Sequence, residues 1–355
     1  MEMDTYKKLA DHLDSLPGGF APSDTGVELR LLKRLFSPEE AELAAHLKIE
    51  REEAHTIASK AGIAVDEAEQ RLEAMAAKGL IFSVKAENTP TQYHAVPWVV
   101  GIYEFQVNRL DKEFFEDLIE YRRTKHKDPR PQPLAQMRTI PVNKSIEGNL
   151  EVLPYERAEE LVKAHEKYAV APCICRRGAK FMGSNCEAPE ESCLMFGDWA
   201  DYYVRNGQGR YVDRDDILDI LAKADESNLV LQPSNSMEIS FLCTCCGCCC
   251  GALLRLKQLL KPSEAVASPF IATATPETCE GCGTCQDRCQ MEALRLVNEQ
   301  VVLNSDRCIG CGLCVSTCPT ESLILERKPE RKHIPLNIET AWKEISSARA
   351  EKQTM

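Results

Sequence analysis

The sequence predicts an α+β protein built from several domains. At 355 residues, the chain exceeds the usual size of one domain, so two or three domains are expected. Helical spacing of apolar residues dominates the chain up to residue 78, and strand-like runs follow at 80–84 and 93–96. All 18 cysteines lie between residues 173 and 318, and the last eight repeat one spacing. The cysteines therefore separate a thiol-free N-terminal region from two metal-binding regions.

The N-terminal region is expected to begin with an arm over residues 1–24. Helices are then predicted over residues 26–36, from Ser37 onward, from Arg51 onward and over residues 65–78. Ser37 fits an N-cap and Pro38 the first helical position, which marks the second helix start. Runs at 80–84 and 93–96 read as strands. Three helices followed by a small hairpin resemble a winged-helix domain, which would cover residues 25–97.

The remaining boundaries follow from composition. We predict a linker over residues 98–150 that carries a helix around Asp111–Arg123. A cysteine-rich, mainly helical middle domain is expected over residues 151–262, with helices over Pro154–Tyr168 and Arg214–Ala224. A duplicated unit is expected over residues 263–330, followed by a polar C-terminal tail over residues 331–355.

The duplicated unit has the spacing Cys-x2-Cys-x2-Cys-x3-Cys twice, which is typical of a pair of [4Fe–4S] clusters. It resembles bacterial-type two-cluster ferredoxins, in which the fourth ligand of each cluster comes from the other repeat. The resemblance implies that cluster one is held by Cys279, Cys282, Cys285 and Cys318, and cluster two by Cys308, Cys311, Cys314 and Cys289. Gln290 stands where the second repeat has Pro319. Backbone N–H groups are expected to approach the sulfurs at Gly281, Gly283, Gly310 and Gly312.

Ten further cysteines lie in the middle domain: Cys173, Cys175, Cys186, Cys193, Cys243, Cys245, Cys246, Cys248, Cys249 and Cys250. No histidine is close to them in sequence, which favours iron–sulfur clusters over zinc, although a four-cysteine zinc site stays open. The first four could hold one cluster alone. Adjacent cysteines such as Cys248 and Cys249 are expected to serve different clusters. We predict two more [4Fe–4S] clusters, four in all, which share ligands between the first four cysteines and the later six; one cubane plus a larger or non-cubane cluster is the alternative.

Two arginines and the net charge indicate what the protein could bind. Arg176 and Arg177 either offset cluster charge or lie in solvent. The net charge of −12 disfavours nucleic-acid binding, and the predicted 65–78 helix is itself acidic. A basic run from Arg122 to Arg130 indicates a solvated linker or a docking site for an acidic partner. A charged start, clustered thiols and no membrane-spanning stretch predict a cytoplasmic protein.

No Gly-rich dinucleotide fingerprint, P-loop or GxSxG motif is present, so no catalytic residue and no further cofactor are predicted. The order of domains is similar to that of large iron–sulfur proteins of anaerobes. This resemblance implies a non-catalytic electron-transfer component of an oxidoreductase. Its partners would be a flavoprotein, a ferredoxin or oxidoreductase subunits. Two alternatives remain: a redox-sensing winged-helix regulator, and a reductase whose active-site cluster lies in the middle domain.

Overall fold

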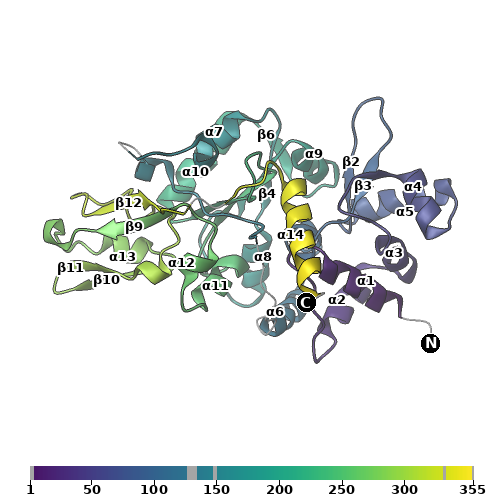
Figure 1. The fold of residues 1–355 in the computed structure, drawn as a ribbon, viewed down its shortest axis with the longest axis horizontal. Coiled ribbons are helices and arrows are strands. Elements are labelled where there is room, and N and C mark those ends of the chain that lie inside the picture. The colour runs from purple at the N-terminus through teal and green to yellow at the C-terminus, as the bar shows by residue number, and fades with distance from the viewer. Residues whose placement is uncertain (1–3, 126–133, 147–149, 331–332, 354–355) are drawn as a thin grey trace.

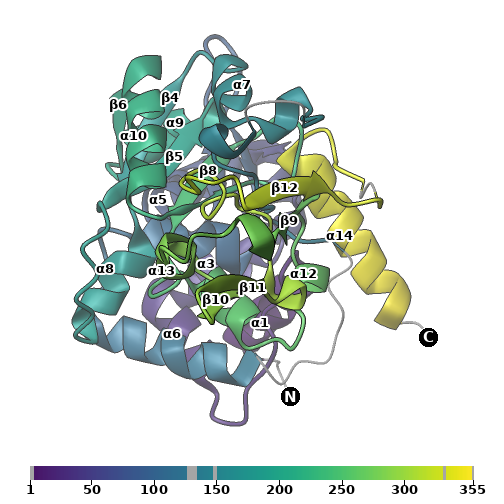
Figure 2. The same ribbon diagram turned by 90° about the vertical axis from the view of Figure 1, so that its left-hand side faces the viewer.

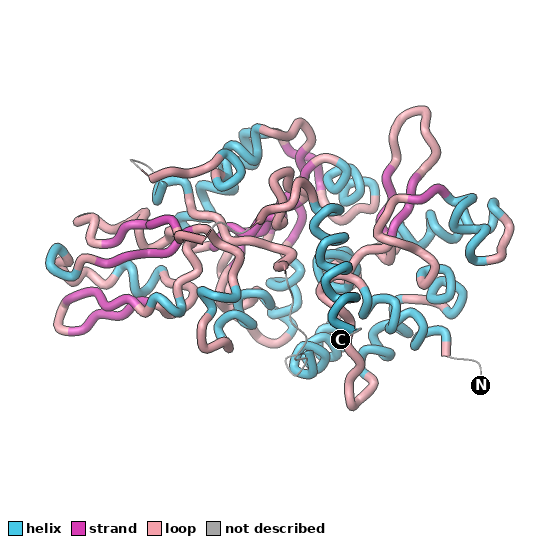
Figure 3. The backbone as a smooth tube through the Cα atoms, viewed as in Figure 1, coloured by secondary structure: helices cyan, strands magenta, loops and turns pink. Residues whose placement is uncertain are grey.

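The computed structural model describes residues 4–125, 134–146, 150–330 and 333–353, and is an α+β structure (Figure 1). The duplicated unit lies at one end of the long axis and the N-terminal helices at the other. Strands gather at the first end and in the centre, whereas helices dominate the second end (Figure 3). In the described part of the chain, no helix is long and apolar enough to cross a membrane.

The N-terminal part combines helices with a small antiparallel sheet in the order β1-β3-β2. Its helices and strands are α1 (Thr5–Ser15), α2 (Val27–Leu35), α3 (Pro38–Ala44), β1 (Glu52–Glu53), α4 (Ala54–Ala61), α5 (Val65–Ala77), β2 (Phe82–Val84) and β3 (Gln92–His94). A capping box starts α3: Glu40 N–H donates to Ser37 Oγ at 3.2 Å, and Ser37 N–H donates to Glu40 Oε2 at 2.9 Å. The helices and strands predicted for this region are therefore present.

The segments expected to be an arm, a linker and a tail all contribute to the N-terminal core. The arm contains α1, whose Leu9 and Leu13 are buried. The linker holds η1 (Trp98–Ile102), η2 (Glu104–Gln106) and α6 (Lys112–Lys125), and Trp98 is buried in the same core. The tail forms α14 (Ile338–Gln353), which buries Trp342 there as well. Each segment is amphipathic, so it gains by covering apolar surface rather than extending into solvent.

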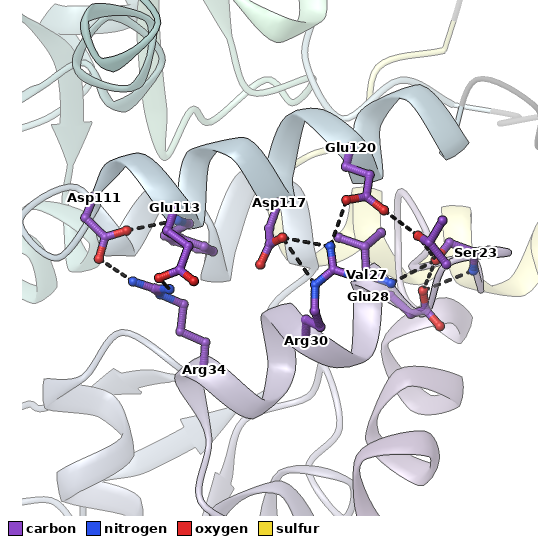
Figure 4. A network of polar contacts seen from close by, with 11 residues as sticks. Ser23, Val27, Glu28, Arg30, Arg34, Asp111, Glu113, Asp117 and Glu120 are labelled. Atoms are coloured by element: carbon purple, nitrogen blue, oxygen red, sulfur yellow. Dashed lines mark hydrogen bonds and ion pairs between the residues drawn. The ribbon is translucent and has the colours of Figure 1, made fainter.

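Ion pairs hold α6 along α2 (Figure 4). Arg30 bridges Asp117 at 2.8 Å and Glu120 at 2.7 Å, while Arg34 pairs with Glu113 at 3.0 Å and with Asp111. Arg30 and Glu120 are substantially exposed, so each pair adds little stability. Together they fix the orientation of α6 while its other face covers the middle domain through α8 (Ile174–Phe181).

A five-stranded antiparallel sheet in the order β6-β4-β5-β8-β7 forms the centre of the middle domain. Its elements are η3 (Asn143–Ile146), η4 (Pro154–Glu156), α7 (Ala158–Lys163), β4 (Tyr168–Pro172), β5 (Glu191–Phe196), α9 (Asp198–Arg205), β6 (Arg210–Val212), α10 (Arg214–Glu226), β7 (Val230–Pro233), β8 (Phe241–Cys245), α11 (Gly251–Lys257) and α12 (Pro262–Ala265). This sheet was not predicted, because its short apolar runs have no distinctive periodicity. The helix predicted over Pro154–Tyr168 is shorter in the structure: α7 covers only Ala158–Lys163, and Tyr168 already begins β4.

The two faces of the central sheet have different neighbours. Ala169 and Met195 face the N-terminal core, whereas Val170 and Leu194 face a second core with α7 and α10. This alternation is the normal two-residue period of a strand. The sheet therefore connects the N-terminal helices with the duplicated unit.

The duplicated unit contains two strand pairs, β9–β12 and β10–β11, seen in front in Figure 2. Its elements are β9 (Phe270–Ala274), η5 (Pro276–Thr278), α13 (Thr284–Arg288), β10 (Leu294–Val297), β11 (Gln300–Leu303), η6 (Ser305–Arg307) and β12 (Leu323–Arg327). The sequence repeat is also a backbone repeat. Glu292 and Glu321, equivalent in the two halves, both have left-handed φ angles, 56° and 52°.

His94 should make the stability of the N-terminal core depend on pH. Its ring is buried against Phe82 and Trp342, and burial lowers its pKa from 6.5 to about 4. Arg51, Glu339 and Asp198 are the charged groups around it. Between the two pKa values the unfolded chain binds the additional proton, so the free energy of unfolding falls as the pH drops. The expected loss from pH 7 to pH 5 is about 2 kcal/mol.

Denaturant unfolding followed by tryptophan fluorescence checks this pH dependence. His94→Gln should have a clearly smaller slope over that range than the wild type, whereas the matched change at the exposed His55, His55→Gln, should behave as the wild type does. Equal slopes for the wild type and His94→Gln would contradict the assignment.

Candidate iron–sulfur and metal-binding sites

The structure brings the eight cysteines of the duplicated unit together in two sets. Cys318 lies in the electrostatic neighbourhood of Cys285, together with Cys279 and Cys282. Cys289 likewise lies beside Cys308, Cys311 and Cys314. Each repeat thus places its last cysteine beside the first three cysteines of the other repeat.

The loops around these thiols fit a cluster. Ala272 N–H donates to Cys308 Sγ at 3.3 Å, Ala293 N–H to Cys289 Sγ at 3.2 Å and Gly281 N–H to Cys279 Sγ at 3.5 Å. A Cβ at Gly310, whose φ is +69°, would lie 2.2 Å from the carbonyl oxygen of Phe270. Only glycine allows this loop to wrap so closely. Donors aimed at sulfur and glycines in wrapped loops are what a thiolate-bound cluster requires.

The two cysteine sets differ in exposure. In the first set Cys282 is exposed and the other three are partly buried. In the second, Cys308 and Cys314 are buried, and burial raises the pKa of Cys311 to about 12. A thiolate so buried needs a bound cation, and metal coordination supplies it. The first site therefore faces solvent and the second faces the protein.

Seven middle-domain cysteines line one cavity, and the six of them other than Cys246 are called the six-cysteine set: Cys173, Cys175, Cys193, Cys243, Cys245 and Cys250. Cys193 and Cys243 are register partners on β5 and β8, and their sulfurs are 4.0 Å apart. Contacts continue from Cys243 to Cys245 and from Cys245 to Cys250. A hydrogen bond from Cys173, helped by Arg122, lowers the pKa of Cys175 to about 5. Six thiols exceed the four that one cubane uses.

The other four form the four-cysteine set: Cys186, Cys246, Cys248 and Cys249, whose sulfurs all lie within 4.8 Å of one another. Each set contains cysteines from both the early and the late group, whereas two expectations for individual thiols differ from the structure. Cys186 is separated from the other early cysteines. Cys248 and Cys249 lie in one site, because they occupy a turn rather than a strand with alternating side chains. Cys245 and Cys246, in contrast, do belong to different sets.

Arg176 lies between the two middle-domain sets and is buried. It donates to the carbonyl oxygen of Thr244 at 2.6 Å, and its Nε has no hydrogen-bond partner among the described residues. Burial opposes its charge, but Cys173 and Cys246 raise its pKa above the usual value. Arg177 instead pairs with Glu190 at 2.6 Å near the surface. Arg176 therefore lies beside the thiols, whereas Arg177 forms an ion pair near the surface.

A cavity of about 1380 Å³ adjoins the six-cysteine set. Arg122, from the predicted basic run, lines it and lies beside Cys175 and Cys250; residues 126–130 of that run are outside the described residues. Glu104 also lines it, and burial raises the pKa of this carboxyl to about 7. Val100, with φ +62°, is strained for a β-branched residue. The basic run at Arg122 is visible in the sequence, but nothing local marks its place beside the cysteines or singles out Glu104 and Val100. The chain topology alone brings residues 98–123 to the cysteines.

The duplicated unit and the four-cysteine set are in direct contact. Gly247 N–H donates to Gln290 Oε1 at 2.6 Å, and Gln290 follows Cys289 directly in the chain. Gly247 is itself flanked by Cys246 and Cys248. The glutamine that replaces the proline of the other repeat therefore joins the two sites.

Comparison with known proteins bears on one part of the chain. Residues 272–319 match the family model of the 4Fe-4S dicluster domain. No curated protein and no solved structure matches the chain. The match and the clustered thiols support [4Fe–4S] clusters as cofactors of this protein.

Proposed function

We propose that this chain passes single electrons through its clusters as a cytoplasmic component, or dedicated partner, of a larger oxidoreductase. In this proposal Cys279, Cys282, Cys285 and Cys318 hold cluster one, and Cys308, Cys311, Cys314 and Cys289 hold cluster two. The difference in exposure between these two sites carries the proposal. Cluster one, with the exposed Cys282, would exchange electrons with an external carrier such as a flavoprotein or a ferredoxin.

Cluster two would deliver electrons inward. Its loop shares a hydrophobic core with thiols of the six-cysteine set: Ile309 and Leu313 belong to the core that contains Cys245 and Cys250. Buried apolar side chains lie between these sites, so the dielectric there is low. This arrangement supports an electron route from cluster one through cluster two to the six-cysteine set.

The N-terminal unit, proposed as winged-helix-like, would select a protein partner. The exposed side of α5 carries Asp66, Glu67 and Glu69. Two nearby cations form ion pairs within the unit: Arg71 pairs with Glu67 at 2.5 Å, and Lys78 with Glu40 at 2.6 Å. DNA phosphates would be repelled by this helix, which disfavours the regulator alternative. A basic protein surface is the complementary partner.

A second function is favoured by the cavity. Glu104, with a pKa near neutrality, could hold and release a proton close to the six-cysteine set. The strained Val100 lies on the same cavity wall, and such strain is common at reactive sites. In this alternative, the cluster of the six-cysteine set is the active site of a reductase, and the ferredoxin-like unit supplies its electrons.

Replacing Cys311 with serine tests the proposed route. The anaerobic variant should lose about four irons and four sulfides per chain, the content of one cubane. Reduction of the middle-domain signal by a photoreduced viologen, followed by EPR after rapid freezing, should slow at least tenfold. The N-terminal fold, measured by far-UV circular dichroism, should persist because Cys311 lies far from its core.

The control is Cys282→Ser, which removes a ligand of cluster one instead and should slow the first reduction step. Unchanged iron content and unchanged reduction rate in Cys311→Ser would overturn the route. Reoxidation of the reduced wild type by a small disulfide or other organic acceptor, without a protein partner, would favour the reductase alternative.

A further inference from the structure

The sulfurs of the four-cysteine set have the spacing of a single-ion site. Cys186 and Cys246 are 3.8 Å apart, and Cys248 and Cys249 are 3.6 Å apart. A tetrahedral ion with metal–sulfur bonds of about 2.3 Å places its ligands about 3.8 Å from one another. We propose that Cys186, Cys246, Cys248 and Cys249 hold one tetrahedral thiolate-bound ion, zinc or iron, instead of a [4Fe–4S] cluster.

The duplicated unit supplies an internal comparison. In a cubane each cysteine binds a different iron and its sulfur points outward, so the four sulfurs lie farther apart than around one ion. The two ferredoxin-like sets do not come within 4.8 Å as groups of three or more. Among the described residues, which include all 18 cysteines, only the four-cysteine set does. The six-cysteine set contains no such compact group either. The close spacing of sulfurs is therefore specific to the four-cysteine set.

The surroundings suit a closed thiolate site. Ser184 Oγ lies 3.6 Å from Cys249 Sγ, within reach to donate to a thiolate, and Arg176 hydrogen-bonds Cys246. Cys246 and Cys249 are buried, so the ion would lie partly out of water. Four thiolates around a divalent ion leave two negative charges, and Arg176 offsets one of them. Donors to the sulfurs and a nearby cation are what stabilise such a site.

Binding of the ion requires no oxidant or reductant. Four thiols give up four protons as one divalent ion enters, and four metal–sulfur bonds form. The ion ties the loop that carries Cys186 to the turn at residues 246–249. That turn also receives the hydrogen bond of Gln290, so the ion would fix the surface on which the duplicated unit rests. The assignment is independent of whether the chain transfers electrons.

Acid-labile sulfide distinguishes the two kinds of site. The full chain, purified without oxygen from cells supplied with both metals, is compared with Cys248→Ser for zinc, iron and sulfide. Removing a single-ion site should lower the metal content by one ion per chain and leave sulfide unchanged. Removing a cubane would remove about four irons and four sulfides. The matched control, Cys282→Ser, should show this second pattern.

A wild-type measurement covers the case in which Cys248→Ser does not fold. X-ray absorption at the zinc edge should show four sulfurs at about 2.3 Å and no neighbouring metal. If the ion is iron, the oxidised protein should show the high-spin ferric EPR signal of an isolated ion. Loss of sulfide in Cys248→Ser, or neither a thiolate-bound zinc nor an isolated iron in the wild type, would overturn the proposal.

Discussion

Replacing Arg288 with methionine should lower the free energy of unfolding by about 3–5 kcal/mol, because it leaves a buried carboxylate without its cation. Arg288 Nη2 donates to Asp225 Oδ1 at 2.6 Å, and both side chains are about nine-tenths buried. Arg288 Nε also donates to the carbonyl oxygen of Leu313, next to Cys314. The ion pair joins α10 of the middle domain to the loops of cluster two, so we expect cluster two to be lost together with the contact.

Urea unfolding under anaerobic conditions, followed by the visible absorbance of the clusters, measures this effect. Lys257→Met is the control, because Lys257 pairs with the exposed Glu292 across the same boundary at 3.0 Å and should cost less than about 1 kcal/mol. In the double variant Arg288→Met, Asp225→Leu, stability should largely return, since no unpaired charge remains. A double variant as unstable as Arg288→Met would show that burial of the unpaired carboxylate is not the cause.

Gly312→Ala should destabilise cluster two, whereas the equivalent change Gly283→Ala should be mild at cluster one. Gly312 has φ +74°, and a Cβ there would lie 2.0 Å from Ser145 Oγ and 2.6 Å from Ser145 Cβ. Rotating the serine relieves only the first overlap, so the backbone of η3 must move. Gly283 has φ +79°, and its nearest neighbour would be Leu296 Cδ1 at 3.8 Å.

The left-handed backbone alone costs alanine about 1–2 kcal/mol, and this term is common to both variants. The overlap at Gly312 adds about 1–3 kcal/mol. Sulfide content and the midpoint of thermal loss of cluster absorbance check the difference. Similar midpoints for the two variants would show that residues 142–146 do not clamp this loop.

The ferredoxin-like unit could be predicted because its chemistry is local. Fixed spacings within each repeat bring three thiols into one loop, and the glycines mark where the backbone turns tightly. The match over residues 272–319 agrees with that prediction. The chain topology, rather than the sequence spacing, decides how the other ten thiols are grouped. Cys186 joins Cys246 across 60 residues because β5 and β8 are neighbours in a sheet that short apolar runs could not reveal.

The N-terminal elements were predictable from helical periodicity and one capping box, but their partners were not. Nothing local in α1 or α14 indicates that the two helices pack together. Arg122 shows the same limit. A basic run at the end of a helix gives no sign that one of its cations enters the cavity beside Cys175.

The contact between α1 and α14 has a consequence for biosynthesis. Leu9 and Trp342 share one core, so that core stays open on the ribosome until the last described helix has been made. All 18 cysteines lie between these two helices and emerge before α14. Cofactor insertion can therefore precede the closing of the N-terminal core. Cys175, Cys193 and Cys243 pack against this core, so a chain without their metal offers α14 a less ordered surface. Release of α14, detected by limited proteolysis, would then report incomplete maturation of the centres that it does not touch.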